Sequence, residues 1–188
     1  MKNRGFTLIE LLVVVLIIGV LVSIALPKYQ KAIQKTHNAK LKQIIRDIAK
    51  AEEVYFLAND KYSANFSDLD LNLPLTPMET TGNKTKSVGV CATTVQGMDS
   101  GRSGEGFYIV LNQTSAALTG LTIGGYWSSG PYTCTGFGIT MSSRKLYCRE
   151  KKSGTNPYQG APGSFCEKIE QGEYNEGSGS TWRIYDLP

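Results

Sequence analysis

An unbroken apolar stretch near the N-terminus dominates the hydropathy pattern of the chain. It runs from Phe6 to Leu26, a length of 21 residues. As a helix it would extend roughly 30 Å, which matches the hydrocarbon core of a bilayer. Four residues interrupt it: Thr7, Glu10, Gly19 and Ser23. We therefore predict a membrane-spanning helix over residues 6–27, preceded by a short basic segment over residues 1–5.

Beyond Pro27 the pattern becomes that of an amphipathic helix over residues 28–58. Its apolar side chains recur at helical spacing and form one stripe, composed of Tyr29, Ile33, Leu41, Ile44, Ile45, Ile48, Val54 and Tyr55. Its charged side chains lie on the opposite face and include Lys40, Lys42, Arg46, Asp47, Lys50 and Glu53. We expect the stripe to pack on a sheet and the charged face to meet water or neighbouring molecules. Anionic lipid head groups are the alternative partner of the basic residues.

Residues 59–188 show turn and strand signals, which predict a globular β-rich head. Asn59-Asp60-Lys61 ends the helix, and residues 59–86 are typical of a surface connecting loop. Strands are expected over residues 87–95, 106–112, 118–127, 133–142, 145–150 and 181–187. The predicted fold class is therefore α+β, with the long N-terminal helix packed on a C-terminal antiparallel sheet.

Residues 4–10, Arg-Gly-Phe-Thr-Leu-Ile-Glu, resemble the prepilin signature of type IV pilins and type II secretion pseudopilins. The match comprises the Gly5–Phe6 junction, Glu10 at the fifth position after it and Pro27 at the twenty-second. It covers residues 1 to about 55. In this family a membrane-embedded prepilin peptidase cuts after the glycine. The resemblance implies that the leader peptide 1–5 is removed after Gly5 and that Phe6 becomes the N-methylated first residue. It also implies the ladle-shaped pilin architecture, in which residues 6–27 form the filament core.

The acid inside the apolar run requires a partner. A carboxylate at the centre of a membrane helix costs about 2.5–3.5 kcal/mol on insertion scales. Glu10 lies four residues from the amine that cleavage would create on Phe6, on the same helix face. The resemblance implies that Glu10 of an incoming subunit pairs with the Phe6 amine of its neighbour and sets the register of assembly. The alternative is that Glu10 only balances its own amine.

Two residues lower helical stability within this part of the chain. Pro27 has no N–H to donate and its ring clashes with the preceding turn. Gly19 reduces helix propensity by up to about 1 kcal/mol relative to Ala. Residues 20–26 are therefore expected to be the least stable part of the helix. The resemblance implies that they lose helical structure in assembled filaments.

A secretory signal peptide has a similar layout, because Ser23-Ile24-Ala25 offers a small-x-small cleavage site. An acid in the apolar region counts against it, as does a pattern that continues into the next helix. A plain signal anchor is the other alternative. The formal net charge of +4 falls by two if Lys2 and Arg4 leave with the leader, so it gives little reason to expect an anionic partner. The same two residues favour a cytoplasmic N-terminus.

Four cysteines, Cys91, Cys134, Cys148 and Cys166, lie in the head. Their even number and the export of the head favour two disulfides. Of three possible connectivities we favour Cys91–Cys134, which would link two expected strands, and Cys148–Cys166, which would close the Gly/Pro-rich loop 149–165. The second loop resembles the disulfide-bounded C-terminal region of many type IV pilins, whereas major pseudopilins more often hold this region with calcium. A zinc site is the alternative, but the chain has no CxxC pair.

Other chemistry-bearing residues give weak signals. The chain has no Gly-rich phosphate loop, and His37, its single histidine, has no Cys, Asp or Glu at metal-ligand spacing. We therefore expect a solvated His37 and predict no enzyme activity, no cofactor and no metal site. Residues 96–105 are expected to form a flexible turn, whose Asp99 and Glu105 lack the spacing of a calcium loop. A basic cluster lies beside Tyr147 and consists of Arg144, Lys145, Arg149, Lys151 and Lys152. Nucleic acid would require such a strip, but a solvated hairpin is the favoured interpretation.

These observations and the resemblance together predict a structural subunit of a type IV pilus-like filament. Its expected partners are identical or related pilin subunits, a prepilin peptidase and methylase, and an inner-membrane assembly platform. It is expected first in the inner membrane, as a single-pass protein with a cytoplasmic N-terminus, and then in a periplasm-spanning or cell-surface filament. One alternative is a type II secretion pseudopilin. A second is a membrane-anchored binding module that does not polymerise.

Overall fold

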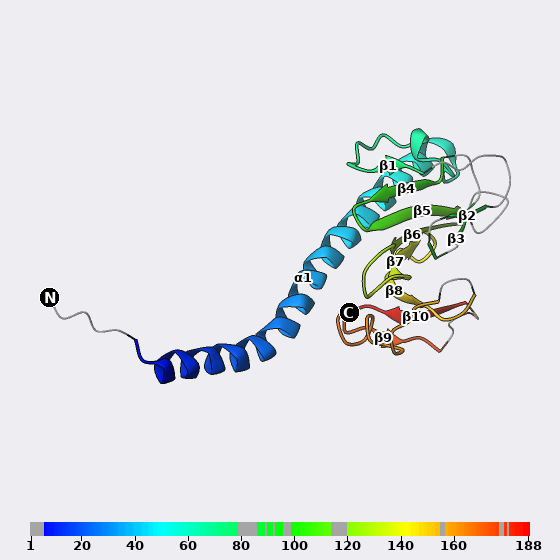
Figure 1. Ribbon diagram of the computed structural model, residues 1–188. Helices are drawn as coiled ribbons and strands as arrows, with labels where there is room; N and C mark the ends of the chain where they lie inside the picture. Colours follow the sequence, from blue (N-terminus) through cyan, green and yellow to red (C-terminus); the bar gives the residue numbers. More distant parts are fainter. Residues whose placement is uncertain are drawn as a thin grey trace. The chain divides into compact units, whose positions relative to one another are not determined.

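A computed structural model of the chain describes residues 6–78, 86–88, 90–91, 93–95, 99–113, 120–154, 157–176, 179 and 181–188. The chain divides into two compact units, Met1–His37 and Asn38–Pro188. One long helix, α1 (Leu8–Asn59), contributes residues to both units, and the strands belong to the second (Figure 1).

Helix α1 combines the two helical segments that the sequence predicted. Helical geometry continues through Gly19 and Pro27 in the isolated chain. The low helical stability of residues 20–26 therefore stays a prediction for the assembled state. The helix ends one residue beyond the predicted boundary. There Asn59 Nδ2 donates to the Tyr55 carbonyl at 3.0 Å, and Asp60 adopts a left-handed φ of 55°, a conformation in which helices commonly terminate.

The second unit contains an eight-stranded sheet in which every neighbouring pair is antiparallel. In spatial order its strands are β1 (Thr76–Pro77), β4 (Gly101–Gly104), β5 (Phe107–Gln113), β6 (Leu121–Trp127), β7 (Thr135–Thr140), β8 (Leu146–Lys151), β10 (Trp182–Asp186) and β9 (Glu173–Tyr174). A short 3-10 helix, η1 (Phe66–Asp68), precedes β1, and a separate hairpin pairs β2 (Lys86–Val88) with β3 (Thr93–Val95). The predicted α+β class is confirmed.

The second half of α1 buries its apolar stripe against one face of the sheet. Leu41, Ile45 and Ile48 are fully buried in the same core as alternate residues of β5, β6 and β7. Gly125 on β6 makes room for the helix, because a Cβ at this position would lie 2.9 Å from methyl groups of Leu41 and Ile45. The predicted stripe is wrong at Tyr29, Ile33 and Val54, which are 64, 39 and 68% exposed.

We expect a Gly125→Val substitution to push α1 away from the sheet. The added side chain would enter space that Leu41 and Ile45 already fill, and such overpacking costs about 1–3 kcal/mol. Urea unfolding of the full chain in detergent, followed by near-ultraviolet circular dichroism, measures the loss. Valine at Gly130, where a Cβ would meet nothing within 4 Å, is no control because its φ is +83°. Ala58→Val on the exposed part of α1 is the suitable control.

A polar network fastens α1 to the rest of the second unit. Asn38 is fully buried, donates to Glu170 at 2.7 Å and accepts the indole N–H of Trp127 at 3.1 Å. Lys42 donates to the second oxygen of the Glu170 carboxylate at 2.6 Å. Lys42 was expected on a water-facing side of the helix, and that prediction is wrong, because its ammonium neutralises an acid that the fold draws toward α1.

Several segments differ from the sequence-based expectation. η1 and β1 form within the expected connecting loop 59–86, and β9 was not expected. Gly101–Gly104, inside the expected flexible turn, forms β4 and pairs with β5 across a tight turn in which Gly106 has φ +77°. Asp99 is part of this structure, since it holds Arg102 and accepts the Ser67 N–H at 2.9 Å. The Arg102 hydrogen bond holds the pKa of Asp99 below its usual range. Gly and Ser disfavour strands, but pairing with a buried neighbour overrides that propensity.

The expected strand 87–95 is also wrong. Its described residues form the β2–β3 hairpin, with Val90 and Cys91 in a turn. Cys91 is bonded to Cys134, so this point of the chain is tied to the main sheet. The remaining expected strands correspond to β5, β6, β7, β8 and β10.

An acid on the buried side of α1 was not anticipated. Glu52 is fully buried. One carboxylate oxygen accepts the Ser63 N–H at 2.9 Å, and the other has no hydrogen-bond partner among the described residues. Burial raises the pKa of Glu52 to about 7, the Ser63 N–H lowers it and the charge of Asp68 raises it. The carboxyl group is therefore accommodated best when it is protonated.

The raised pKa of Glu52 predicts a pH-dependent stability of the head. Because the folded-state pKa lies above the ordinary value of 4.5, the stabilisation is complete below pH 4.5 and is lost as the pH rises through 7. The loss amounts to at most about 3 kcal/mol. Urea unfolding of the full chain at pH 5 and pH 8 measures it. Glu52→Gln should remove most of this difference, and an unchanged difference would contradict the assignment.

Candidate functional site

The first turn of α1 forms a reciprocal cap between Thr7 and Glu10. A Glu10 carboxylate oxygen accepts from the Thr7 backbone N–H at 2.8 Å and from the Thr7 hydroxyl at 2.6 Å. The Glu10 N–H in turn donates to the Thr7 hydroxyl at 3.3 Å. This is the capping box, in which a Thr and a Glu three residues apart satisfy the free N–H groups of a helix start.

Glu10 was expected to be a functional residue, but the capping role of Thr7 was not anticipated. The signal was present, because the pattern Thr-x-x-Glu directly before an apolar run marks a helix N-terminus. The cap gives the Glu10 carboxylate partners within its own chain. Gly5 lies outside the described residues.

The surface of α1 around Glu10 is apolar and exposed. Every large hydrophobic side chain from Phe6 to Leu26 is between 47 and 83% exposed. Among the described residues α1 alone is long and apolar enough to cross a membrane. Phe6, Ile9, Val13 and Val14 form the apolar walls of a shallow groove that also includes Glu10. This surface requires a lipid or protein environment, since fully burying one Leu, Ile or Val side chain is worth about 1.5–3 kcal/mol.

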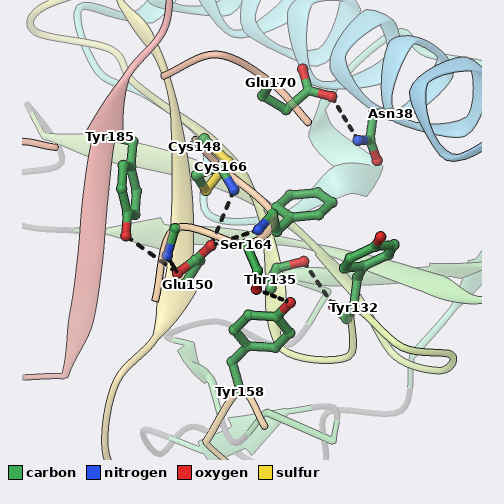
Figure 2. Close-up of a disulfide and its surroundings, with 12 residues drawn as sticks. Asn38, Tyr132, Thr135, Cys148, Glu150, Tyr158, Ser164, Cys166, Glu170 and Tyr185 are labelled. Carbon is green, nitrogen blue, oxygen red and sulfur yellow. Dashed lines mark hydrogen bonds between the residues drawn. A yellow bond between two sulfur atoms is a disulfide. The ribbon is translucent and has the colours of Figure 1, made fainter. Parts of the chain in front are cut away.

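The C-terminal part of the head is held by a disulfide and a buried carboxylate (Figure 2). Cys148 on β8 is bonded to Cys166, as the sequence analysis favoured. Two residues beyond Cys148 lies Glu150, which is fully buried. Its carboxylate accepts the backbone N–H groups of Gly163, Phe165 and Cys166 at 2.8, 3.0 and 3.1 Å.

A fourth donor completes the partners of Glu150. The Tyr185 hydroxyl donates to it at 3.3 Å, and Figure 2 shows this hydroxyl directed at the carboxylate. Burial and the neighbouring Glu150 raise the pKa of Tyr185, which keeps the hydroxyl protonated. An acidic side chain thus holds the loop backbone directly. Within the described residues no group of three His, Cys, Asp or Glu side chains is placed to hold a metal ion.

The second disulfide joins Cys91 to Cys134, the other favoured pairing. Lys151 supports this region, because its ammonium donates to the Cys91 carbonyl at 2.6 Å. Lys151 is 3% exposed, and burial lowers its pKa.

The basic cluster does not form one exposed strip. Lys151 is buried, and the Arg149 guanidinium lies 4.5 Å from the ring centroid of Tyr126 and 5.2 Å from that of Trp182. Arg144 is exposed and pairs with Glu53 at 3.3 Å. Neither a continuous nucleic-acid strip nor a wholly solvated hairpin describes these residues. His37 is exposed, as predicted.

Comparison with known protein families concerns mainly the N-terminal helix. Residues 1–26 match the model of the prokaryotic N-terminal methylation motif. The chain carries this motif. It begins before the cleavage junction expected between Gly5 and Phe6, and it includes Glu10.

Curated relatives match the chain over stretches that are longer than this motif. The type IV major pilin protein PilA of Myxococcus xanthus is 40% identical over 62 residues, which is 33% of this chain and 28% of that protein. The type IV wide pilus major component PilA4 of Thermus thermophilus is 35% identical over 83 residues, 43% of this chain and 63% of the relative. The type II secretion system core protein G of Escherichia coli is 36% identical over 69 residues, which is 37% of this chain and 48% of that protein.

These matches confirm the resemblance to type IV pilins and type II secretion pseudopilins. Each covers less than two thirds of the relative's own length. No solved structure matches the chain significantly.

Proposed function

We propose that this chain is a structural subunit of a type IV pilus-like filament. The single observation that carries the proposal is the exposed apolar surface of residues 6–26, which includes one acid and lies within the methylation motif. A membrane helix that only anchors a head has no use for a carboxylate at this depth. A helix that leaves lipid to pack among identical helices can use it to choose one register.

Processing after Gly5 would create the partner for that acid. The new amine on Phe6 would lie at the start of the same helix that Thr7 and Glu10 cap. In a membrane-inserted subunit the cap satisfies the carboxylate internally. In a filament the groove of Phe6, Ile9, Val13 and Val14 would receive a neighbouring N-terminus, whose positive amine replaces part of the cap as the partner of Glu10.

The same reasoning assigns partners and location. The peptidase and methylase act at Gly5 and Phe6, the filament consists of identical or related subunits, and an inner-membrane platform extracts them. The subunit first spans the inner membrane with its N-terminus in the cytoplasm, and the filament then crosses the periplasm or extends from the cell surface. Two disulfides in the head agree with an oxidising compartment.

A type II secretion pseudopilin is the second candidate, favoured by the similarity to core protein G. We prefer the pilin because Glu150 and the Cys148–Cys166 disulfide hold the C-terminal loop, where major pseudopilins more often use calcium.

Shearing of intact cells followed by electron microscopy and labelling with an antibody to the head tests the proposal. Long labelled surface fibres are the expected result. Short polymers confined to the envelope would identify a pseudopilin. A chain that stays monomeric in the membrane under cross-linking would contradict a filament role and leave a membrane-anchored binding module. Cells without prepilin peptidase are the control, in which no polymer of this chain should form.

A further inference from the structure

Helix α1 presents two chemically different flanks on either side of the stripe that it buries in the head. On one flank, Arg46 and Lys50 line an open groove of about 670 Å³. On the other, Ala51, Val54 and Ala58 line a groove of about 440 Å³. Helical periodicity places these two sets of residues on opposite sides of Ile45, Ile48 and Glu52. Both grooves belong entirely to the unit Asn38–Pro188.

The first groove, which we call the basic groove, has an excess of cations. It is lined by Lys42, Arg46, Lys50, Arg144 and Lys145, and by the acids Glu53, Glu170 and Asp186. Lys42 is paired with Glu170, Lys50 with Asp47, and Arg144 with Glu53. Arg46 and Lys145 are exposed and take part in no ion pair within the part of the chain that the structure describes. The groove therefore retains positive charge for a partner.

The second groove, which we call the acidic groove, combines an apolar wall with two carboxylates. Val54 remains 68% exposed on this flank, beside Ala51 and Ala58. Asp68 and Asp70 line the same groove. Asp68 accepts from the Ser63 hydroxyl at 2.7 Å, whereas Asp70 is exposed and has no ion pair among the described residues. An apolar surface with an acidic edge is suited to a partner that is basic.

We propose that the acidic groove of one subunit docks on the basic groove of a second copy of this chain, with Asp70 facing Lys145 and Arg46. The charge complementarity of the two grooves identifies the occupant. Since the two surfaces differ and lie on opposite flanks of one helix, each subunit offers both halves of a heterologous contact. Such a contact repeats from subunit to subunit instead of closing as a two-fold dimer, and it builds an open filament when the rotation between subunits does not close a ring. The interface rests on the proposed function and adds a contact between heads to the contact between N-terminal helices.

Charge exchange in the full chain tests this interface in the cells that assemble it. Asp70→Lys and Lys145→Glu should each lower the amount of sheared filament by about fivefold or more, since each places like charges in contact. The double variant should restore a large part of the yield, because the Asp70–Lys145 pair is rebuilt with its signs exchanged while Arg46 keeps its positive charge. Two exposed residues outside both grooves provide matched controls, Glu173→Lys and Lys168→Glu, and both should assemble normally.

A second measurement uses unmodified filaments and does not depend on variant folding. A zero-length carbodiimide should join the Asp70 carboxylate to the Lys145 amine. Filaments mixed from isotopically light and heavy subunits should yield this cross-linked peptide with one half of each mass.

For the charge-exchange variants, the amount of protein in the membrane fraction reports insertion, and non-reducing gels report whether the disulfides form.

The outcomes separate this interface from the proposed function. If wild-type filaments form but lack the Asp70–Lys145 cross-link, or carry one from Asp70 to a different protein, the interface is wrong while the filament role stands. The same conclusion follows if the double variant assembles no better than the inserted single variants, or if both single variants assemble normally. If the wild-type chain never polymerises, the function and the interface are both overturned.

Discussion

Replacement of Glu10 by valine should leave membrane insertion intact and reduce filament yield at least about tenfold. Removal of the carboxylate saves the cost of about 2.5–3.5 kcal/mol for an acid at membrane depth, so the variant should insert more readily. Without the acid, the Phe6 amine of a neighbour has no partner within the apolar groove. A loss of about 1.4 kcal/mol per contact already weakens the association equilibrium tenfold. Immunoblots of the sheared and membrane fractions measure both effects.

Two variants separate the charge of Glu10 from its capping role. Glu10→Gln retains the side-chain oxygen that accepts from Thr7 and satisfies the capping box, but it lacks the charge. Thr7→Val removes the capping hydroxyl and leaves the acid. If the charge sets the register, Glu10→Gln should assemble as poorly as Glu10→Val, and Thr7→Val should be milder. Normal filaments from Glu10→Val would remove Glu10 from the account of assembly altogether.

Replacement of Glu150 by alanine should destabilise the head by about 3–5 kcal/mol, the range for breaking a buried charged network. The substitution leaves the N–H groups of Gly163, Phe165 and Cys166 without an acceptor. The Tyr185 hydroxyl also loses its partner. The Cys148–Cys166 disulfide would still connect the loop to β8, but the loop backbone would no longer be held against it.

Urea unfolding of the full chain in detergent measures this effect, and limited proteolysis locates it. Cleavage should concentrate between Cys148 and Cys166 in the Glu150→Ala protein. Glu173→Ala removes an exposed acid from β9 and should behave as wild type. A Glu150→Ala protein as stable and protease-resistant as this control would mean that the disulfide alone secures the loop.

The helix could be predicted almost completely from the sequence, because one 21-residue apolar run and one amphipathic stripe dominate the first 59 positions. The strands that coincide with apolar alternation, such as Phe107–Gln113, were also predictable. β4 was not, since Gly101–Gly104 becomes a strand only through its pairing with β5. That pairing is a tertiary property which local propensity does not encode.

The candidate site shows the same division. Glu10 stood out because it interrupts an apolar run, whereas Thr7 required attention to the short capping pattern. Nothing local in the sequence distinguished Glu150 from the basic residues around it. Its role depends on a β-strand that carries it to the backbone of a loop 13–16 residues later. The buried Glu52 was missed for a similar reason, because it lies between Lys50 and Glu53 of the charged face and no local pattern sets it apart.

The most direct test of a processed filament subunit is the mass and N-terminal sequence of the chain in sheared surface fibres. We expect a chain that begins at Phe6 and is heavier by CH2 than the sequence 6–188 with two disulfides, because one N-methyl group replaces a hydrogen. A chain that begins at Leu26, as ordinary signal-peptide cleavage after Ala25 would produce, or one that retains Met1–Gly5, would contradict this expectation.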